Sequence, residues 1–477
     1  MCFSIDSLYA WFRRSPYLVF WISVFCATAL MALFVQLVML PHLFPELHAG
    51  SGLLIGGDWV GFHMIAVELA EKVHAQGWSA WELRPHNHPP AGIAAAIYTL
   101  TVPEPYVLIP LNATLHATTG VVLMRIFRYL TNSDFIALCA ALPFVAYPST
   151  MAWYAQIHKD GFYFAGTFLC LYGWILLARV PTWQLGWRPV LAGLAWLGAG
   201  VALMGLVRPH SFQVMQGMGF ILAMGLTMLF IVRGVKKKLP WKSCAAAIVI
   251  LFLVPLLLRL APIDPKLSSE VPATTFINES AENLYPPNRQ TLSLAEASVK
   301  DCWRPSNWLP NLVENNFLWL AIQRDKYILR EPGLDKNQKA GSMIDINVHL
   351  SSAQDFITYL PRAVQIGLFA PFPIHWIAQG ASPGGSMMRR LAGAEMIGVY
   401  CALLFLPYAL WRWRNRVEMW LPVAFGTILI LVYTFATPNL GSLYRQRYGF
   451  LMLLVGIGVA GCFNLLKQRA SRQTNKR

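Results

Sequence analysis

Long apolar segments recur along the whole chain, and they constrain its fold more than any other feature of the sequence. Each is close to the length of about 20 residues that an α-helix needs to cross a bilayer. Ten of them are expected to span a membrane: residues 17–40, 106–124, 135–149, 162–177, 190–207, 212–232, 245–260, 391–410, 420–436 and 450–466. Two shorter stretches, 91–100 and 363–377, are interrupted by Pro or Gly and are interfacial, re-entrant or additional spans. The predicted fold class is an all-α polytopic membrane protein with about 10–13 transmembrane helices.

The charged residues support the same class. Only 13% of the residues are charged, whereas a soluble domain carries about a quarter. Half of the 38 Lys and Arg residues lie in six segments that alternate with the ten spans and contain one acid, Asp6. These segments are residues 1–16, 125–132, 179–189, 233–242, 412–417 and 467–477. By the positive-inside rule, both termini are expected in the cytoplasm. The net charge of +15 therefore reflects topology, and no nucleic-acid partner is predicted.

The spans divide the chain into three parts. Residues 1–261 form a transmembrane region whose long first outer loop, 42–105, is expected to carry surface helices. Apolar residues from Val60 to Val73 recur at helical spacing, which is typical of an amphipathic helix lying along the membrane. Residues 262–390 form an outer, periplasmic segment, and residues 391–477 hold the last spans and a basic cytoplasmic tail.

Five polar stretches fall at the ends of the predicted spans, all on the outer face. They are residues 57–63 (GDWVGFH), 84–90 (RPHNHPP), 158–161 (HKDG), 208–210 (RPH) and 444–448 (YRQRY). Two of them carry a carboxylate, Asp58 and Asp160, just before an expected helix. Such a residue is either a helix cap or a general base or cation ligand, and these roles are compatible.

Four cations in the same stretches could hold an anionic group, namely Lys159, Arg208, Arg445 and Arg447. Arginine binds phosphate in a bidentate manner, and lysine does so as a point charge. The alternatives are snorkelling of Arg208 to headgroups and interfacial anchoring by the tyrosines. Polar residues expected to line a substrate cavity are His63, His86, His88, His210 and Tyr444.

This inventory predicts group transfer at the outer face. The chain has no P-loop and no Rossmann fingerprint, and no nucleotide pool is assumed outside the cytoplasm. A donor must then arrive through the membrane, and a polyprenyl-phosphate-linked sugar fits this requirement. Its phosphate is a good leaving group, so one carboxylate and several cations suffice.

The chain resembles polytopic glycosyltransferases of the C superfamily, which include the protein mannosyltransferases and the aminoarabinose transferase of lipid A. The resemblance rests on Gly57-Asp58-Trp59 in the first outer loop, on His88-Pro89-Pro90 and on Lys159-Asp160. A late outer domain and the final 444–448 turn are also similar to bacterial members.

The resemblance implies roles for the residues of these motifs. Asp58 would be the catalytic carboxylate, and Asp160 would support the acceptor or a divalent cation. The four cations would hold the donor phosphate, and the acceptor would be a lipid, glycan or protein. Trp59 stands where many relatives carry a second acid, which leaves a need for Mg or Mn open.

The rival hypotheses are a polysaccharide polymerase or ligase and a lipid or solute transporter. Transporters usually place several ionisable groups in the middle of the membrane. In this chain, Glu395 is the only acid that lies well inside a predicted span.

Overall fold

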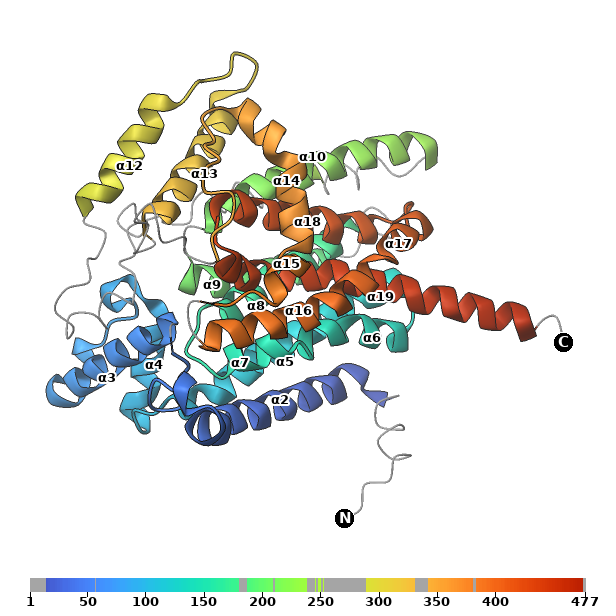
Figure 1. Ribbon diagram of the computed structural model, residues 1–477. Helices are drawn as coiled ribbons and strands as arrows, with labels where there is room; N and C mark the ends of the chain where they lie inside the picture. Colours follow the sequence, from blue (N-terminus) through green and yellow to red (C-terminus); the bar gives the residue numbers. More distant parts are fainter. Residues whose placement is uncertain are drawn as a thin grey trace. The chain divides into compact units, whose positions relative to one another are not determined.

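The computed structural model describes residues 14–55, 57–179, 187–208, 211–237, 289–330, 342–380 and 383–474, together with residues 245, 248, 249 and 252. Within these ranges the regular structure is helical, and two isolated β-bridges are the only strand-like pairs. The predicted all-α fold class is confirmed for this part of the chain (Figure 1).

The α-helices are α2 (Pro16–Phe34), α3 (Asp58–Gln76), α4 (Pro89–Leu100), α5 (Ile109–Thr131), α6 (Asp134–Val145), α7 (Pro148–Tyr154), α8 (Asp160–Ala178), α9 (Trp187–Val207), α10 (Ser211–Lys237), α12 (Arg289–Cys302), α13 (Asn311–Arg330), α14 (Ala353–Phe369), α15 (Pro373–Trp376), α16 (Pro383–Leu403), α17 (Leu406–Arg412), α18 (Val417–Ala436) and α19 (Leu440–Thr474). A π-helical segment, Val35–Leu43, extends α2, and single 3-10 turns form at Pro45–Leu47, Trp78–Ala80, Pro85–Asn87 and Pro105–Leu108.

Seven helical segments in the described ranges are long and apolar enough to cross a membrane. They are Pro16–Leu43, Pro105–Thr131, Asp160–Ala178, Arg188–Val207, Gly384–Arg412, Val417–Ala436 and Leu440–Gln473. Each coincides with one of the ten predicted spans, so the chain is a helical polytopic membrane protein by length and composition of its helices.

The other three predicted spans have different outcomes. Residues 135–149 form two helices, α6 and α7, with a bend of 63° between them, which is a broken span or a re-entrant loop. Residues 212–232 lie in α10, whose described apolar part, Val214–Met228, is shorter than a full span. Residues 245–260 lie almost wholly outside the described residues. Residues 91–100 form the short helix α4, which is an apolar helix of only 12 residues.

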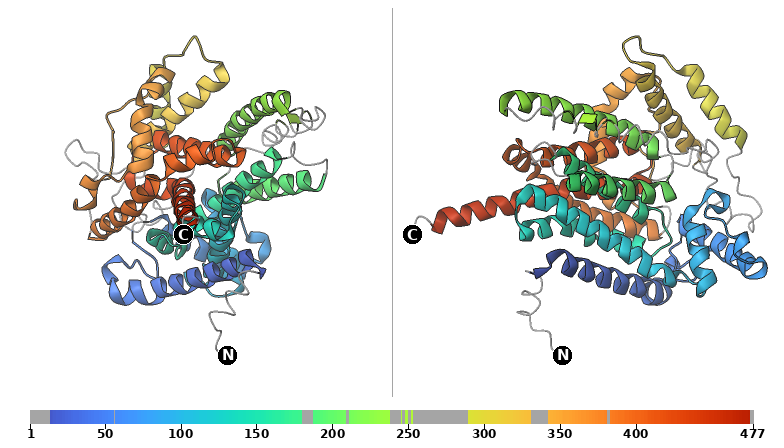
Figure 2. Two further views of the ribbon diagram at one scale, coloured as in Figure 1. Left: turned by 90° about the vertical axis from the view of Figure 1, so that its right-hand side faces the viewer. Right: turned by 180° about the vertical axis from the view of Figure 1, so that it is seen from behind.

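The chain divides into two compact units. Unit 1 comprises Met1–Ile277, Phe405–Phe425 and Val455–Arg477, and unit 2 comprises Asn278–Leu404 and Gly426–Leu454. In unit 1, α2 packs on α5, α5 packs on α6 and α8, and α8 packs on α9 (Figure 2). The helices α3 and α4 of the first outer loop pack on each other.

The apolar face of α3 is therefore covered by protein. Ile65, Leu69 and Val73 are buried, whereas the opposite face presents exposed Glu68 and Lys72. We expected this face to lie along the membrane surface, and its packing against α4 replaces that contact within the described residues. The helix ends at Gly77, whose φ of 83° is favourable for glycine.

Helices α8 and α9 pack closely because glycines face each other. A Cβ added to Gly166 would lie 2.6 Å from the carbonyl oxygen of Gly200, and one on Gly173 would lie 2.7 Å from that of Gly193. Small residues allow this approach of helix backbones in membranes. The two pairs run in opposite chain directions, so the end of α9 lies beside the start of α8.

Unit 2 has an apolar core built from α12, α13, α14, α18 and the start of α19. Its completely buried or nearly buried members include Ala321, Phe356, Ala363, Ile366 and Leu443.

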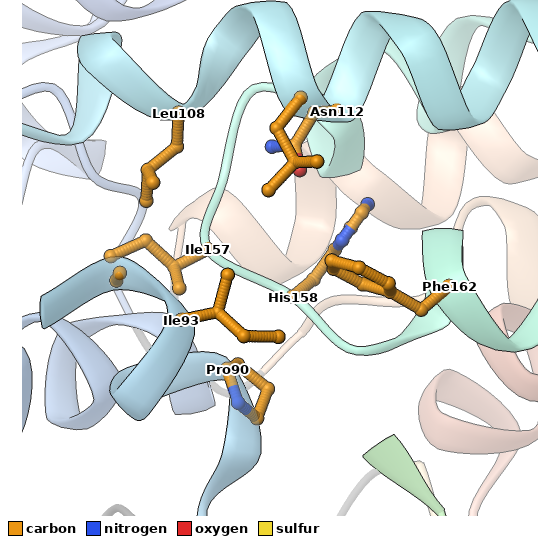
Figure 3. A pocket seen from close by; sticks show the side chains of 9 residues that line it. Pro90, Ile93, Leu108, Asn112, Ile157, His158 and Phe162 are labelled. Carbon is orange, nitrogen blue, oxygen red and sulfur yellow. The ribbon is translucent and has the colours of Figure 1, made fainter. Parts of the chain in front are cut away.

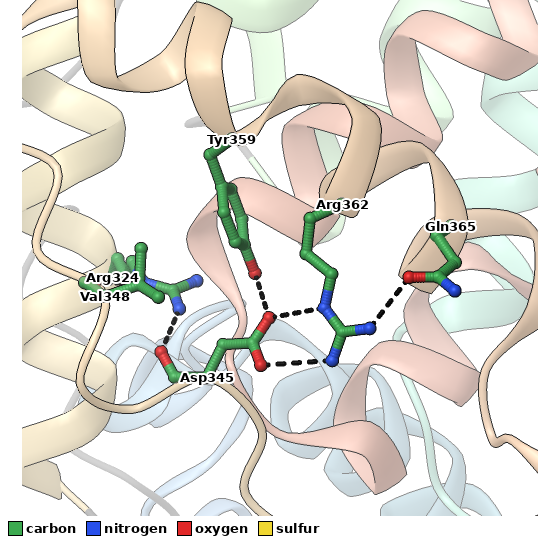
Figure 4. Close-up of polar contacts among 6 residues, drawn as sticks. All are labelled: Arg324, Asp345, Val348, Tyr359, Arg362 and Gln365. Atoms are coloured by element: carbon green, nitrogen blue, oxygen red, sulfur yellow. Dashed lines mark hydrogen bonds and ion pairs between the residues drawn. The ribbon is translucent and has the colours of Figure 1, made fainter.

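A buried arginine, Arg324 of α13, connects this core to the segment before α14. Its guanidinium donates to the carbonyl oxygens of Asp345 at 2.7 Å and of Val348 and Phe435 at 3.3 Å. The Asp345 carboxylate in turn accepts from the Tyr359 hydroxyl and from Arg362 (Figure 4). Buried polar groups need such partners because leaving them unsatisfied is costly.

Candidate functional site

Asp58 begins α3, and Gly57 occupies the N-cap position. The Asp58 side chain is half-buried. An acid in the first turn interacts favourably with the helix dipole. The next residue, Trp59, is buried, and its indole N–H donates to the carbonyl oxygen of Leu54 at 2.5 Å. This bond closes the loop ahead of the helix and fixes where Asp58 enters it.

The RPHNHPP stretch makes a strained turn between α3 and α4. His86 and Asn87 both have positive φ values, 50° and 66°, which cost of order 1–2 kcal/mol each for residues other than glycine. The turn leaves His86 exposed and buries His88, whose ring lies 5.3 Å from that of Phe62. Two prolines then start α4. Strain of this kind is found at functional sites, where the surrounding structure maintains it.

His63, one turn into α3, faces α4. Its Nδ1 atom lies 3.0 Å from the Tyr98 hydroxyl. Burial lowers the pKa of His63, and Glu104 opposes this only weakly. Burial also raises the pKa of Tyr98. Both groups are therefore neutral at neutral pH and hold the two helices together by a hydrogen bond.

The loop between α7 and α8 is anchored by buried amide side chains. The Asn112 side chain of α5 donates to the carbonyl oxygens of Tyr154 and Gln156, each at 2.9 Å. The side chain of Gln36 donates to the carbonyl oxygen of Ala155. These loop carbonyl groups have no partner within a helix, and the side-chain bonds satisfy them in an apolar environment.

The same loop contacts the segment that precedes α3. The Gln156 Oε1 atom accepts from the backbone N–H of Leu54 at 3.0 Å. Leu54 also accepts the bond from Trp59, the residue after Asp58. The stretches 57–63 and 158–161 are thus connected through two hydrogen bonds.

Asp160 and Arg208 form a buried ion pair. Asp160 is the first residue of α8, and Arg208 directly follows α9. An Arg208 Nη2 atom donates to Asp160 Oδ1 at 2.5 Å, and both side chains are about 95% buried, with 5% and 6% exposed. The Arg208 guanidinium also lies over the Tyr163 ring, 4.7 Å from its centre. Close packing of α8 on α9 is what brings these two sequence-predicted residues together.

The stretch 84–90 reaches the same end of α9. An Arg84 Nη2 atom donates to the carbonyl oxygen of Gly205 at 2.9 Å, three residues before Arg208. Four of the five polar stretches therefore meet at one end of unit 1: residues 57–63, 84–90, 158–161 and 208.

A small pocket lies among these elements (Figure 3). Pro90 and Ile93 of α4, Asn112 of α5, and His158 and Phe162 around the start of α8 line it. Its free volume is about 10 Å³, which is about the space of one water molecule. The pocket with its side chains in these positions is therefore much smaller than a sugar.

Three of the predicted residues lie in unit 2. The Tyr444 hydroxyl donates to Glu395 Oε2 at 2.6 Å, and both side chains are buried. The Arg447 guanidinium is buried and donates to the backbone carbonyl oxygens at the end of α14. Cations at a helix C-terminus are stabilising. Arg445 beside it is half-buried. Glu395 of α16 is thus hydrogen-bonded to a neighbouring helix, α19.

Two further predicted residues are His210 and Lys159. His210 lies outside the described residues. Lys159 is half-buried at the N-cap position of α8. Among the residues with a described position, no group of three or more His, Cys, Asp or Glu side chains is arranged to hold a metal ion.

Three residues of this site were not predicted to belong to it: Gln36, Asn112 and Gln156. His158 lies in the predicted stretch 158–161, but it was assigned no role. A signal for two of the three exists in the sequence, since Gln36 and Asn112 interrupt apolar spans where an amide is expensive unless it is bonded. Which carbonyl group each one binds depends on packing between helices far apart in sequence.

No family model, curated protein or solved structure matches this chain.

Proposed function

We propose that the chain is a membrane glycosyltransferase. It moves a sugar from a polyprenyl-phosphate-linked donor to an acceptor hydroxyl at the periplasmic face of a bacterial inner membrane. The observation that carries this proposal is the meeting of four polar stretches at one end of unit 1, around the buried Asp160–Arg208 pair. Carboxylates, guanidinium groups and histidines gathered where apolar helices end suit chemistry on a substrate that is partly lipid.

The proposed roles follow from the environment of each group. Asp58, half-buried at the start of α3, removes the proton from the acceptor hydroxyl. The acceptor oxygen then bonds to the anomeric carbon, and the bond from that carbon to the phosphate oxygen breaks. Asp160 is held by Arg208 and supports the acceptor by position. The pocket-lining His158 and Asn112 are placed to orient the reacting group.

The donor phosphate leaves as an anion and needs cations. Lys159 and Arg208 stand beside Asp160 in unit 1, and we assign them to the phosphate. Arg445 and Arg447 were predicted for the same role and lie in unit 2. There the bonds of Arg447 to the end of α14 favour a structural role for that residue.

The test is transfer from a radiolabelled polyprenyl-phosphate sugar by the purified protein in proteoliposomes. Asp58→Asn is expected to reduce the turnover at least 100-fold, a typical loss for a general acid–base group, while insertion and thermal stability are retained. Asp160→Asn is expected to reduce the turnover as strongly and also to lower the thermal stability, because Arg208 stays buried without its carboxylate partner. Glu71→Gln, a neutralised acid on the exposed face of α3, is the control and is expected to leave turnover unchanged. Full activity of both Asp variants would remove the mechanism.

The same preparation separates the rival functions. A transporter or flippase would move labelled lipid between leaflets without forming a glycosidic product. A polysaccharide polymerase or ligase would form a product only with a multi-sugar donor or acceptor.

A further inference from the structure

Arginine and tyrosine side chains gather at the other end of unit 1, away from the pocket. Tyr17 lies at the start of α2, Arg125 and Tyr129 lie in the last turns of α5, and Tyr172 and Arg179 lie at the end of α8. We call these five residues the arginine–tyrosine cluster.

The cluster is contiguous. The Arg125 guanidinium lies 4.9 Å from the centre of the Tyr17 ring, and that of Arg179 lies 4.5 Å from the centre of the Tyr129 ring. Arg125 and Tyr129 lie four residues apart on the same face of α5, which joins the two halves. The rings of Tyr129 and Tyr172 are 6.0 Å apart.

Positive charge exceeds negative charge here. Arg128 pairs with Asp134 at 2.7 Å, and Arg179 pairs with Glu418 at 3.5 Å. Arg416 donates to the carbonyl oxygen of Leu130, the end of α5, at 2.8 Å.

Arg125 has no carboxylate partner among the residues that the structure describes. Its Nε–H is buried and finds no acceptor there. An arginine so placed retains both charge and hydrogen-bonding capacity for a ligand.

The position of the cluster indicates what the ligand is. Its residues lie where three candidate spans end, which is the level of the lipid headgroups. Next to Tyr17, Leu18 is 52% exposed, and Leu30 and Phe34 are exposed further along α2. An apolar helix face below a cationic cluster suits acyl chains below a phosphate.

We propose that the arginine–tyrosine cluster binds the phosphodiester headgroup of an anionic phospholipid, with Arg125 as its principal ligand. The planar guanidinium donates two bonds to phosphate oxygens, and the Tyr17 and Tyr172 hydroxyls are placed to donate further ones. The acyl chains lie along the exposed face of α2. This site is separate from the proposed transfer reaction and does not depend on it.

Native mass spectrometry of the detergent-purified protein with phosphatidylglycerol or phosphatidylcholine tests the site. The wild-type protein is expected to retain phosphatidylglycerol preferentially. Arg125→Gln should reduce that retention about fivefold, the usual effect of one basic residue at a membrane surface. Arg125→Lys should recover only part of it, because an ammonium lacks the planar geometry. The matched control is Arg469→Gln, which removes an exposed charge from α19 and should change nothing.

A second measurement uses only the wild-type protein, so it tests the site even if an Arg125 variant does not fold. A photoactivatable phosphatidylglycerol is cross-linked to the wild-type protein and the adduct is mapped. We expect adducts on peptides that contain Tyr17 or Arg125, with competition by phosphatidylglycerol vesicles and none by millimolar glycerol phosphate. Competition by glycerol phosphate would assign the site to a soluble phosphate instead. Equal retention of the two lipids, equal loss in both Gln variants, or adducts confined to other peptides would overturn the proposal.

Discussion

Buried guanidinium groups in this chain have two kinds of hydrogen-bond partner, backbone carbonyl oxygens and a carboxylate. Arg324 and Arg447 donate to backbone carbonyl oxygens, which completes the hydrogen bonding of helix ends and loops. Arg208 instead binds the carboxylate of Asp160. All three are arginines in or beside apolar sequence, and only their partners distinguish them.

Asp345 shows how a carboxylate can be wholly structural. Its φ is 51°, and it accepts from the Tyr359 hydroxyl and from two nitrogens of Arg362 (Figure 4). Burial by itself would raise the pKa of Asp345, but the hydrogen bonds from Arg362 and Tyr359 outweigh it. The pKa of Asp345 therefore lies below its ordinary value.

The sign of the resulting pH dependence follows. A carboxyl whose pKa is lower in the folded state stabilises the fold above its unfolded pKa, near 4, and loses this effect as the pH falls through the folded pKa. Asp345→Asn should reduce the free energy of unfolding by about 1 kcal/mol at pH 7 and flatten its decline below pH 4. Thermal unfolding in detergent from pH 2.5 to pH 7 measures this. Asp301→Asn, on an exposed acid of α12, is the control, and identical curves for both variants would contradict the assignment.

Among the helices, the α8–α9 pair has the greatest influence on the candidate site. Its glycine contacts bring Arg208 to Asp160, and Arg84 then binds the same end of α9. The polar site is thus positioned by a contact that contains no polar side chain. Helix α4 contributes through its two initial prolines, which set the direction of the chain after a strained turn.

Two alanine substitutions on α9 test this packing. A Cβ at Gly200 would clash with the backbone of α8, whereas one at Gly198 meets nothing within 4 Å. Gly200→Ala should destabilise the protein by about 1–3 kcal/mol through overpacking. Gly198→Ala should be neutral or stabilising by up to about 1 kcal/mol, because alanine favours helix. Melting temperatures of the two purified variants check this, and a Gly200→Ala protein as stable as the Gly198→Ala protein would contradict the close approach.

Across unit 1, the two ends of the helices differ in their chemistry. One end holds the aspartates, histidines and amides around the pocket, and the other holds the arginine–tyrosine cluster. This separation matches the pattern of basic segments from which the topology was predicted, and it gives that topology a direct test.

Single cysteines in a background without native cysteines would measure sidedness. Trp78→Cys lies in the first outer loop and Ser471→Cys in the last turn of α19, both at exposed positions. In intact spheroplasts, a membrane-impermeant maleimide is expected to label the first at least tenfold faster than the second, because a bilayer excludes charged reagents. Permeabilised membranes, in which both should react, provide the control. Faster labelling of position 471 in intact cells would invert the topology.

The periodicity and length of the apolar runs were enough to predict an all-helical membrane protein and to locate seven candidate spans. The reason is that a helix in lipid must satisfy its own backbone hydrogen bonds and needs about 20 apolar residues to cross the bilayer. The prediction of one span over residues 135–149 missed the bend of 63° between α6 and α7, which falls at Pro148, where the residue before the proline leaves the helical conformation. The ion pair of Asp160 with Arg208 and the bonds of Gln156 and Arg84 join residues 48 to 121 positions apart. Such contacts depend on how the helices pack. The periodicity of one helix does not show which distant residue will contact it.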